Sequence, residues 1–210
     1  MNMILQIILS FLFAVLGAVF GAVVTLFIEK KRLPKIEIIA RDLANADNTY
    51  NSGPHQGERW KFFRLSVNNK KITPFFNWLV IRQTAENCRA TINIKGMDNP
   101  IVISFKGRWA STPEIPHLGQ NAVLKLIEPD PVTIPENHEE FLDVIVKYEK
   151  DKEGYGWNNE AYFHNWRTPH YKLNPGRYQV YVKINTQNGV SFLEKFSLTV
   201  GERIEDTCLS

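Results

Sequence analysis

The distribution of apolar and polar residues divides the chain into one continuous apolar segment and a longer region of short alternating patterns. No charged side chain occurs from Met1 to Ile28, and Ile4–Ile28 is a run of 25 residues rich in Leu, Ile, Val, Phe, Ala and Gly. Because about 20 apolar helical residues cross a bilayer core, this run predicts a transmembrane helix over residues 3–28. The lipid bilayer is therefore the first partner that the sequence indicates.

A cleaved signal peptide is the alternative interpretation of this segment. Such peptides have a basic start, a shorter apolar stretch and a small-x-small cleavage site. Here no Lys or Arg precedes the run, which ends in Leu26, Phe27, Ile28 and Glu29. We therefore expect an uncleaved, single-pass anchor followed by a basic juxtamembrane linker over residues 29–34.

Basic residues after the apolar run predict its orientation. Lys30, Lys31, Arg32 and Lys35 follow it directly, whereas only the α-amino group precedes it. Basic flanks stay in the cytosol, so the C-terminal part should be cytoplasmic. The two cysteines, Cys88 and Cys208, are expected to be reduced and unpaired, which agrees with that compartment.

Small residues recur along the apolar run at helical spacing and predict a face for self-association. They are Gly17 and Gly21, with Ala14, Ala18 and Ala22 beside them. Small side chains let two helix backbones approach closely in lipid. Gly and Ala are also common in membrane helices that do not associate, so both interpretations stay open.

Short runs of period two dominate the sequence after Pro34 and predict β-strands. The runs cover residues 35–39, 62–68, 78–82, 91–95, 101–105, 123–127, 142–148, 178–184 and 192–200. Polar, Pro- or Gly-bearing breaks separate them, and Gln187-Asn188-Gly189 is typical of a hairpin turn. The pattern predicts an all-β, antiparallel β-sandwich over residues 35–201, with a C-terminal tail over residues 202–210.

Three segments carry more specific expectations. In the run 142–148, alternate residues from Leu142 should share one face, with Asp143 and Lys147 on the other. Residues 42–59 are polar and rich in Gly and Asn, which indicates a long loop. Residues 83–90 are interpreted as a loop that points Ala85 and Cys88 inward.

The pattern Leu173-x-Pro175-Gly176-x-Tyr178-x-Val180-x-Val182 resembles the turn into the penultimate strand of fibronectin type III and immunoglobulin-like domains. Pro followed by Gly suits a type II turn. The resemblance implies an Ig-like sandwich in which Tyr178 forms a tyrosine corner, its hydroxyl bonded to nearby backbone. It covers about thirty residues, 173–200, and implies no function. The preceding connection, residues 149–172, is much longer than is usual in such domains.

Motifs for catalysis or cofactor binding are scarce, so we expect no enzyme, no cofactor and no metal. His138-Glu-Glu-Phe-Leu142 begins like a zinc-protease helix but has Leu where the second His is needed. The carboxylates of Glu136, Glu139, Glu140 and Asp143 should face solvent, which suits neither acid–base chemistry nor a defined calcium loop. His164 and His170, with Glu160, match no common ligand spacing. The net charge of +3 is dispersed, which argues against nucleic acid.

The segment GYGWNNEAYFHNWRTPHY, residues 154–171, is the densest aromatic stretch after the apolar run. Trp157, Tyr162, His164 and Trp166 are candidate ligand- or partner-binding residues, because exposed aromatic side chains favour interfaces. Trp109, in the loop 108–113, is expected to join Trp166 at one end of the sandwich. The alternative is that the aromatic rings pack on the sandwich.

The sequence as a whole predicts a membrane-anchored, non-catalytic module that recognises an unidentified protein or small molecule. One alternative is a membrane effector whose domain senses a signal while its helix forms a homo-oligomer. The other is an anchored hydrolase whose residues are brought together only by the fold.

Overall fold

A computed structural model describes residues 3–41, 46–49, 56–73, 80–98, 100–113, 128–163 and 166–210. Its elements are α1 (Met3–Arg32), β1 (Ile36–Ala40), β2 (Ala46–Thr49), β3 (Arg59–Asn69), β4 (Ala85–Gly96), β5 (Val102–Trp109), β6 (Val132–Ile134), β7 (Glu139–Tyr148), β8 (Gly154–Gly156), the 3-10 turns η3 (Asn159–Phe163) and η4 (Pro169–Tyr171), β9 (Lys172–Leu173), β10 (Gly176–Asn185), β11 (Ser191–Val200) and β12 (Cys208–Leu209). Side chains are described for all these residues except residues 4, 5, 162 and 163.

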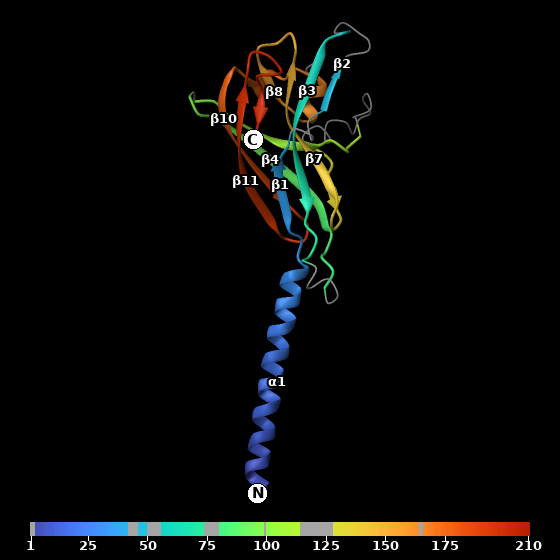
Figure 1. The fold of residues 1–210 in the computed structure, drawn as a ribbon, viewed down its shortest axis with the longest axis vertical. Coiled ribbons are helices and arrows are strands. Elements are labelled where there is room, and N and C mark those ends of the chain that lie inside the picture. The colour runs from blue at the N-terminus through green and yellow to red at the C-terminus, as the bar shows by residue number, and fades with distance from the viewer. Residues whose placement is uncertain are drawn as a thin grey trace.

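Helix α1 projects from one end of the strand-rich domain, as Figure 1 shows. Within Gln6–Arg32, an 18-residue window has a mean hydropathy of 2.7 and none of it is buried, so the helix is long and apolar enough to cross a membrane. The helix continues through Arg32, and only residues 33–35 separate it from β1. The expected linker is therefore mostly the last turn of the helix.

The strands form two antiparallel layers that share β5. One layer has the order β1-β3-β7, and the other has the order β4-β10-β11-β12. Residues 102–107 of β5 pair with β4, whereas Arg108 and Trp109 pair with Asp143 and Leu142 of β7. On the side of the two layers opposite to β5, β1 lies close to β11. An antiparallel all-β fold after one N-terminal helix is thus confirmed.

Alternating residues of both layers build the core. Leu65 and Val67 of β3 meet Ile92 and Ile94 of β4 and the inward residues of β10 in one buried cluster. The inward residues of β10 are those predicted, namely Tyr178, Val180, Val182 and Ile184. The Tyr178 hydroxyl donates to the carbonyl of Asn174 at 2.7 Å, which is the bond expected of a tyrosine corner.

A β-bulge in β7 changes the predicted face of that strand. Phe63 lies opposite Ile145 and Arg64 lies opposite Asp143, so Val144 is an extra residue in the pairing. One inserted residue reverses the side chains that follow it. Val146 consequently points to the face of the sheet opposite to the predicted one, where it is buried in a second apolar cluster. The expectation of one shared face from residue 142 to 148 is wrong for this reason.

Several boundaries also differ from the sequence-based expectation. Residues 80–82, the described part of the predicted strand 78–82, are not in a strand, and the predicted strand 123–127 lies outside the described residues. The segment 83–90, expected as a loop, enters β4 at Ala85, although Ala85 and Cys88 do point inward. Part of the expected loop 42–59 forms β2. The expected tail returns as β12, and Leu209 is buried.

Candidate functional site

The aromatic segment 154–171 is built into the sheet that contains β7. Strand β8 pairs with residues 145–147 of β7 and also with β9. The same edge of β7 pairs with β5 at residues 142–143, so β8 takes the edge where β5 leaves it. At the bulge, the backbone N–H of Trp157 donates to the carbonyl of Val144 at 3.1 Å. The segment therefore closes an otherwise open strand edge.

A second cluster of apolar side chains forms where this segment covers β3 and β7. We call it the outer aromatic cluster. Its buried members are Phe62, Val146, Tyr148, Tyr155, Trp157 and Ala161, and the partly buried Trp60 and Trp166 pack against them. The Trp157 side chain is only 2% exposed and its ring lies 4.8 Å from that of Phe62. Its first role is packing, as the alternative interpretation of the sequence expected.

Two half-buried tryptophans form the accessible part of the cluster. The rings of Trp60 and Trp166 meet edge to face at 6.3 Å, and the Trp166 ring lies 5.3 Å from that of Trp157. Trp60 is a candidate that the sequence interpretation missed. The available signal was the pair Trp60 and Phe62, two large apolar residues on the β3 face opposite Phe63.

The backbone at Trp166 has a left-handed conformation. Its φ is +68°, which is uncommon for any residue other than Gly and costs about 1–3 kcal/mol. Two bonds hold it: the Trp166 N–H donates to Ala161 at 2.8 Å, and the Tyr148 hydroxyl donates to the Trp166 carbonyl at 3.1 Å. The ring of Trp166 is thus fixed in place by its surroundings.

Arg167 fastens the segment to the rest of the domain. Its guanidinium bonds Asp151 at 2.6 Å and the buried Glu58 at 2.8 Å, and it stacks on the Tyr148 ring at 4.0 Å from the centroid. Burial lowers the pKa of Arg167, but its bond to Asp151 and the charges of Asp151 and Glu58 outweigh burial and raise it. The pairing therefore stabilises a charged guanidinium against the Tyr148 ring of the outer aromatic cluster.

Trp109 does not join this surface. Its side chain is fully buried in the core between the layers, and its ring N–H donates to the carbonyl of Cys88 at 3.1 Å. It lies beside Leu142 near the start of β7, whereas Trp166 contacts Tyr148 at the end of the same strand. The structure thus brings Trp157 and Trp166 together but leaves Trp109 with no exposed surface. His164 and the side chain of Tyr162 lie outside the described residues.

Two charged residues of β7, Asp143 and Lys147, are buried, and for Asp143 this is contrary to the expected solvent exposure, whereas Glu139 is exposed as expected. Asp143 accepts a bond from Arg64 at 2.6 Å. Burial raises its pKa, although Arg64 and Arg108 oppose that shift. The Nζ of Lys147 donates to the carbonyls of Asp151, Glu153 and Glu202, and burial lowers its pKa.

The other carboxylates of the predicted acidic cluster have separate partners. Glu136 accepts from the backbone N–H of Ile72, and Glu139 accepts from Ser66. Within the described residues, no three His, Cys, Asp or Glu side chains are placed to hold a metal ion. The part of the cluster that the structure shows is therefore a set of structural contacts.

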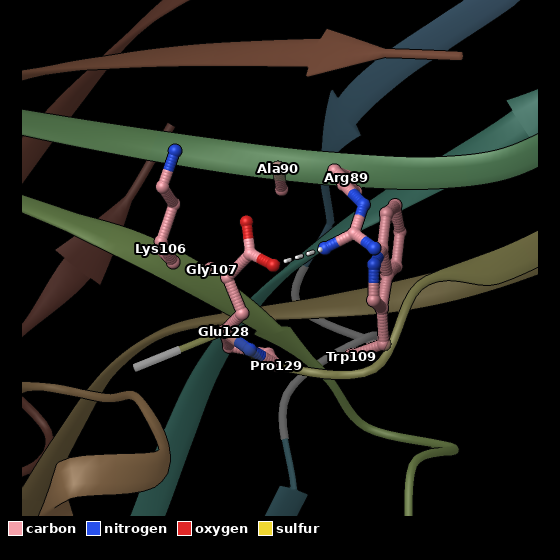
Figure 2. A pocket seen from close by; sticks show the side chains of 7 residues that line it. All are labelled: Arg89, Ala90, Lys106, Gly107, Trp109, Glu128 and Pro129. Carbon is pink, nitrogen blue, oxygen red and sulfur yellow. Dashed lines mark ion pairs between the residues drawn. The ribbon is translucent and has the colours of Figure 1, made fainter. Parts of the chain in front are cut away.

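A crevice between the paired strands β4 and β5 and the residues Glu128 and Pro129 offers little room for a ligand. Figure 2 shows Glu128 facing Arg89 across it, with Trp109 beside them. The two charged groups are 3.1 Å apart, and the space enclosed is about 20 Å³. This volume holds about one water molecule. As the described residues enclose it, the crevice is too small for an organic ligand.

The predicted association face of α1 is open in the monomer. No atom lies within 4 Å of the Cβ positions built on Gly17 and Gly21. Ala14, Ala18 and Ala22 are exposed as well. Self-association through these residues stays a prediction.

Comparison with known proteins adds no relative to this description. No family model matches the chain, and no curated protein matches its sequence. The function must therefore be argued from the residues themselves.

Proposed function

We propose that the chain is a single-pass membrane protein whose immunoglobulin-like sandwich is a non-catalytic recognition module facing the cytosol. The order β1-β3-β7 corresponds to strands A, B and E of an immunoglobulin-like sandwich, and β4-β10-β11 to strands C, F and G. Strand β5 passes from the second layer to the first, as strands C′ or D do. The tyrosine corner at Tyr178 supports the same assignment.

The observation that carries the recognition role is the pair Trp60 and Trp166. Both rings are half-buried, they touch each other, and buried aromatic rings support them. Rigid tryptophans supply contact area at a low entropic cost, and interface hot spots are rich in them. Backbone strain such as that at Trp166 concentrates at functional sites. These properties favour a protein partner that covers the outer aromatic cluster at the end of β7 away from α1.

The cytosolic orientation rests on the basic end of α1. Lys30, Lys31 and Arg32 occupy its last turn, and Lys35 follows. Charged residues retained on the cytosolic side are the main determinant of orientation for a single span. A cytosolic partner is therefore expected.

Site-specific photo-crosslinking in native membranes tests the recognition role. A benzophenone amino acid replaces Trp60 in one sample and Leu193, an exposed apolar residue of β11, in the control. We expect a discrete crosslinked product from position 60 only. Equal products from both positions, or none from position 60, would overturn the proposed surface.

A second substitution links the product to the paired tryptophans. Trp166→Gly removes the ring and relieves the positive φ at once, so the loss of packing and the relief of strain offset each other. The variant should unfold near the wild-type temperature and abolish the product from position 60. A variant that folds and still gives the full product would show that Trp166 takes no part.

A further inference from the structure

A cleft lies where α1 meets the domain. It encloses about 760 Å³, and its walls come from the end of α1, from residues 33–35, from the segment after β3 and from the turn before β11. Sites for small ligands commonly have volumes in this range. Figure 1 shows α1 entering the domain at its C-terminal end, so with α1 in its proposed position across the bilayer the cleft lies at the level of the membrane surface.

The lining of this cleft has one sign of charge. Among the described residues that line it, none is acidic and six are basic, namely Lys30, Lys31, Lys35, Lys70, Lys71 and Arg82. Three carboxylates beside the lining residues have partners: Glu29 pairs with Arg32, Glu37 pairs with Lys70, and Glu136 accepts from the backbone of Ile72. Even with Lys70 paired to Glu37, the other five basic residues gather positive charge in one concave site, which attracts an anion.

The junction that forms the cleft is held by the buried side chain of Asn69. Its carbonyl oxygen accepts from the Lys35 N–H at 3.2 Å, and its amide donates to Gln83 at 3.0 Å and to Ile134 at 3.1 Å. The Gln83 N–H donates to Arg32 at 2.7 Å. The end of α1 and the residues after it are thus bonded to β3 and to residues 82–83, which positions the backbone of the basic residues relative to the domain.

Apolar groups complete the cleft on the side of the helix. Phe27 and Leu33 belong to its lining, and Lys31 lies over the Phe27 ring at 5.4 Å. Ile81, next to Arg82, is 76% exposed. Arg82 itself is fixed, because its guanidinium donates to the Leu33 carbonyl at 2.7 Å. Phe27 lies one helical turn before Lys31, on the side of the apolar span, so an apolar group adjoins the cations as the acyl chains of a phospholipid adjoin its phosphate.

We propose that this cleft binds the headgroup of an anionic phospholipid. The phosphate lies among the lysines, and the start of the acyl chains lies against Phe27 and Leu33. Basic pockets beside membrane helices bind anionic headgroups on the cytosolic side. This inference rests on the proposed membrane span, and it assigns the lysines a defined lipid in addition to their effect on orientation.

The test measures lipid binding to the full-length protein in neutral detergent by native mass spectrometry. The probes are short-chain phosphatidylglycerol, short-chain phosphatidylcholine and inorganic phosphate. The test variant is Lys35→Gln with Lys71→Gln, two exposed residues of the cleft. The matched control is Lys95→Gln with Lys183→Gln, two exposed lysines on β4 and β10 that do not line it.

We expect phosphatidylglycerol to bind the wild type more tightly than phosphatidylcholine. At roughly fivefold for each basic residue, the test variant should weaken its binding by about 20- to 30-fold, and the control should not. Equal binding of the two lipids, or equal affinity in test and control variants, would overturn the proposal. Full displacement of the lipid by an equal concentration of inorganic phosphate would identify a free-phosphate site instead.

The same variants separate this inference from the proposed recognition role. Lys35→Gln with Lys71→Gln should leave the photo-crosslinked product from position 60 unchanged. A wild-type chain that binds both lipids equally but still gives the crosslinked product from position 60 would refute the lipid site alone. A chain that fails to enter bilayer nanodiscs would instead refute the membrane span.

Discussion

Trp157→Ala tests whether the segment 154–171 is an integral part of the fold. The substitution removes a ring that lies 4.8 Å from that of Phe62 and 5.3 Å from that of Trp166. The substitution leaves the hydrogen bond from the backbone N–H of residue 157 to the carbonyl of Val144, so it removes side-chain packing. Replacing a buried Trp by Ala typically costs about 3–5 kcal/mol.

This loss is large against the total stability of a domain, which is about 5–15 kcal/mol. For a domain of this size, each kcal/mol lowers the unfolding midpoint by about 2–4 °C, so the midpoint should fall by roughly 6–20 °C. Thermal unfolding of the full chain in detergent, followed by the circular dichroism of the strands, measures the change. Trp60→Ala is the control, and its half-buried ring should cost about half as much. Trp157→Ala unfolding at the wild-type midpoint would refute the integral packing.

The remaining predictions concern close contacts, the corner and the helix. Gly156→Ala places a Cβ 2.7 Å from Phe105 and should lower the free energy of unfolding in denaturant by about 1–3 kcal/mol. Gly154→Ala, whose Cβ meets Ile145 at an ordinary 3.5 Å, should lower it less, and equal losses would contradict the geometry. Tyr178→Phe loses the bond to Asn174 and should cost about 1 kcal/mol, while Tyr181→Phe, whose hydroxyl bonds the nearby Gln179, should change stability less. Gly17→Leu with Gly21→Leu should reduce helix association in bilayers, measured by energy transfer between labelled chains, and unchanged transfer would exclude this face.

Local patterns predicted the parts of the fold that local physics determines. The apolar run gave α1, because length and hydropathy suffice for a spanning helix. Strand β10 and its corner followed from alternation and from the Pro175-Gly176 turn. The inward positions of Ala85 and Cys88 were also recognised, although the backbone there is extended.

Long-range pairing decided the features that the sequence interpretation missed. The bulge at Val144 depends on how β3 and β7 align, and no local pattern marks it. Asp143 is buried beside Arg64 of β3, and Lys147 donates to Glu202, so each has a partner that is distant in sequence. Burial of Trp109, predicted as a surface residue, follows from β5 joining both layers. The half-exposed Trp60 was missed because its partner Trp166 lies about one hundred residues away.

Labelling of the native cysteines tests most directly whether a membrane helix holds this domain in the cytosol. Cys208 is exposed, whereas Cys88 is buried, and burial raises the pKa of the Cys88 thiol to about 11, so at neutral pH only Cys208 should react. A membrane-impermeant maleimide is applied to intact cells and then to permeabilised ones. The proposed topology predicts that the membrane-bound, full-length chain is labelled only after permeabilisation. Labelling in intact cells, or a shortened chain in the soluble fraction, would contradict it.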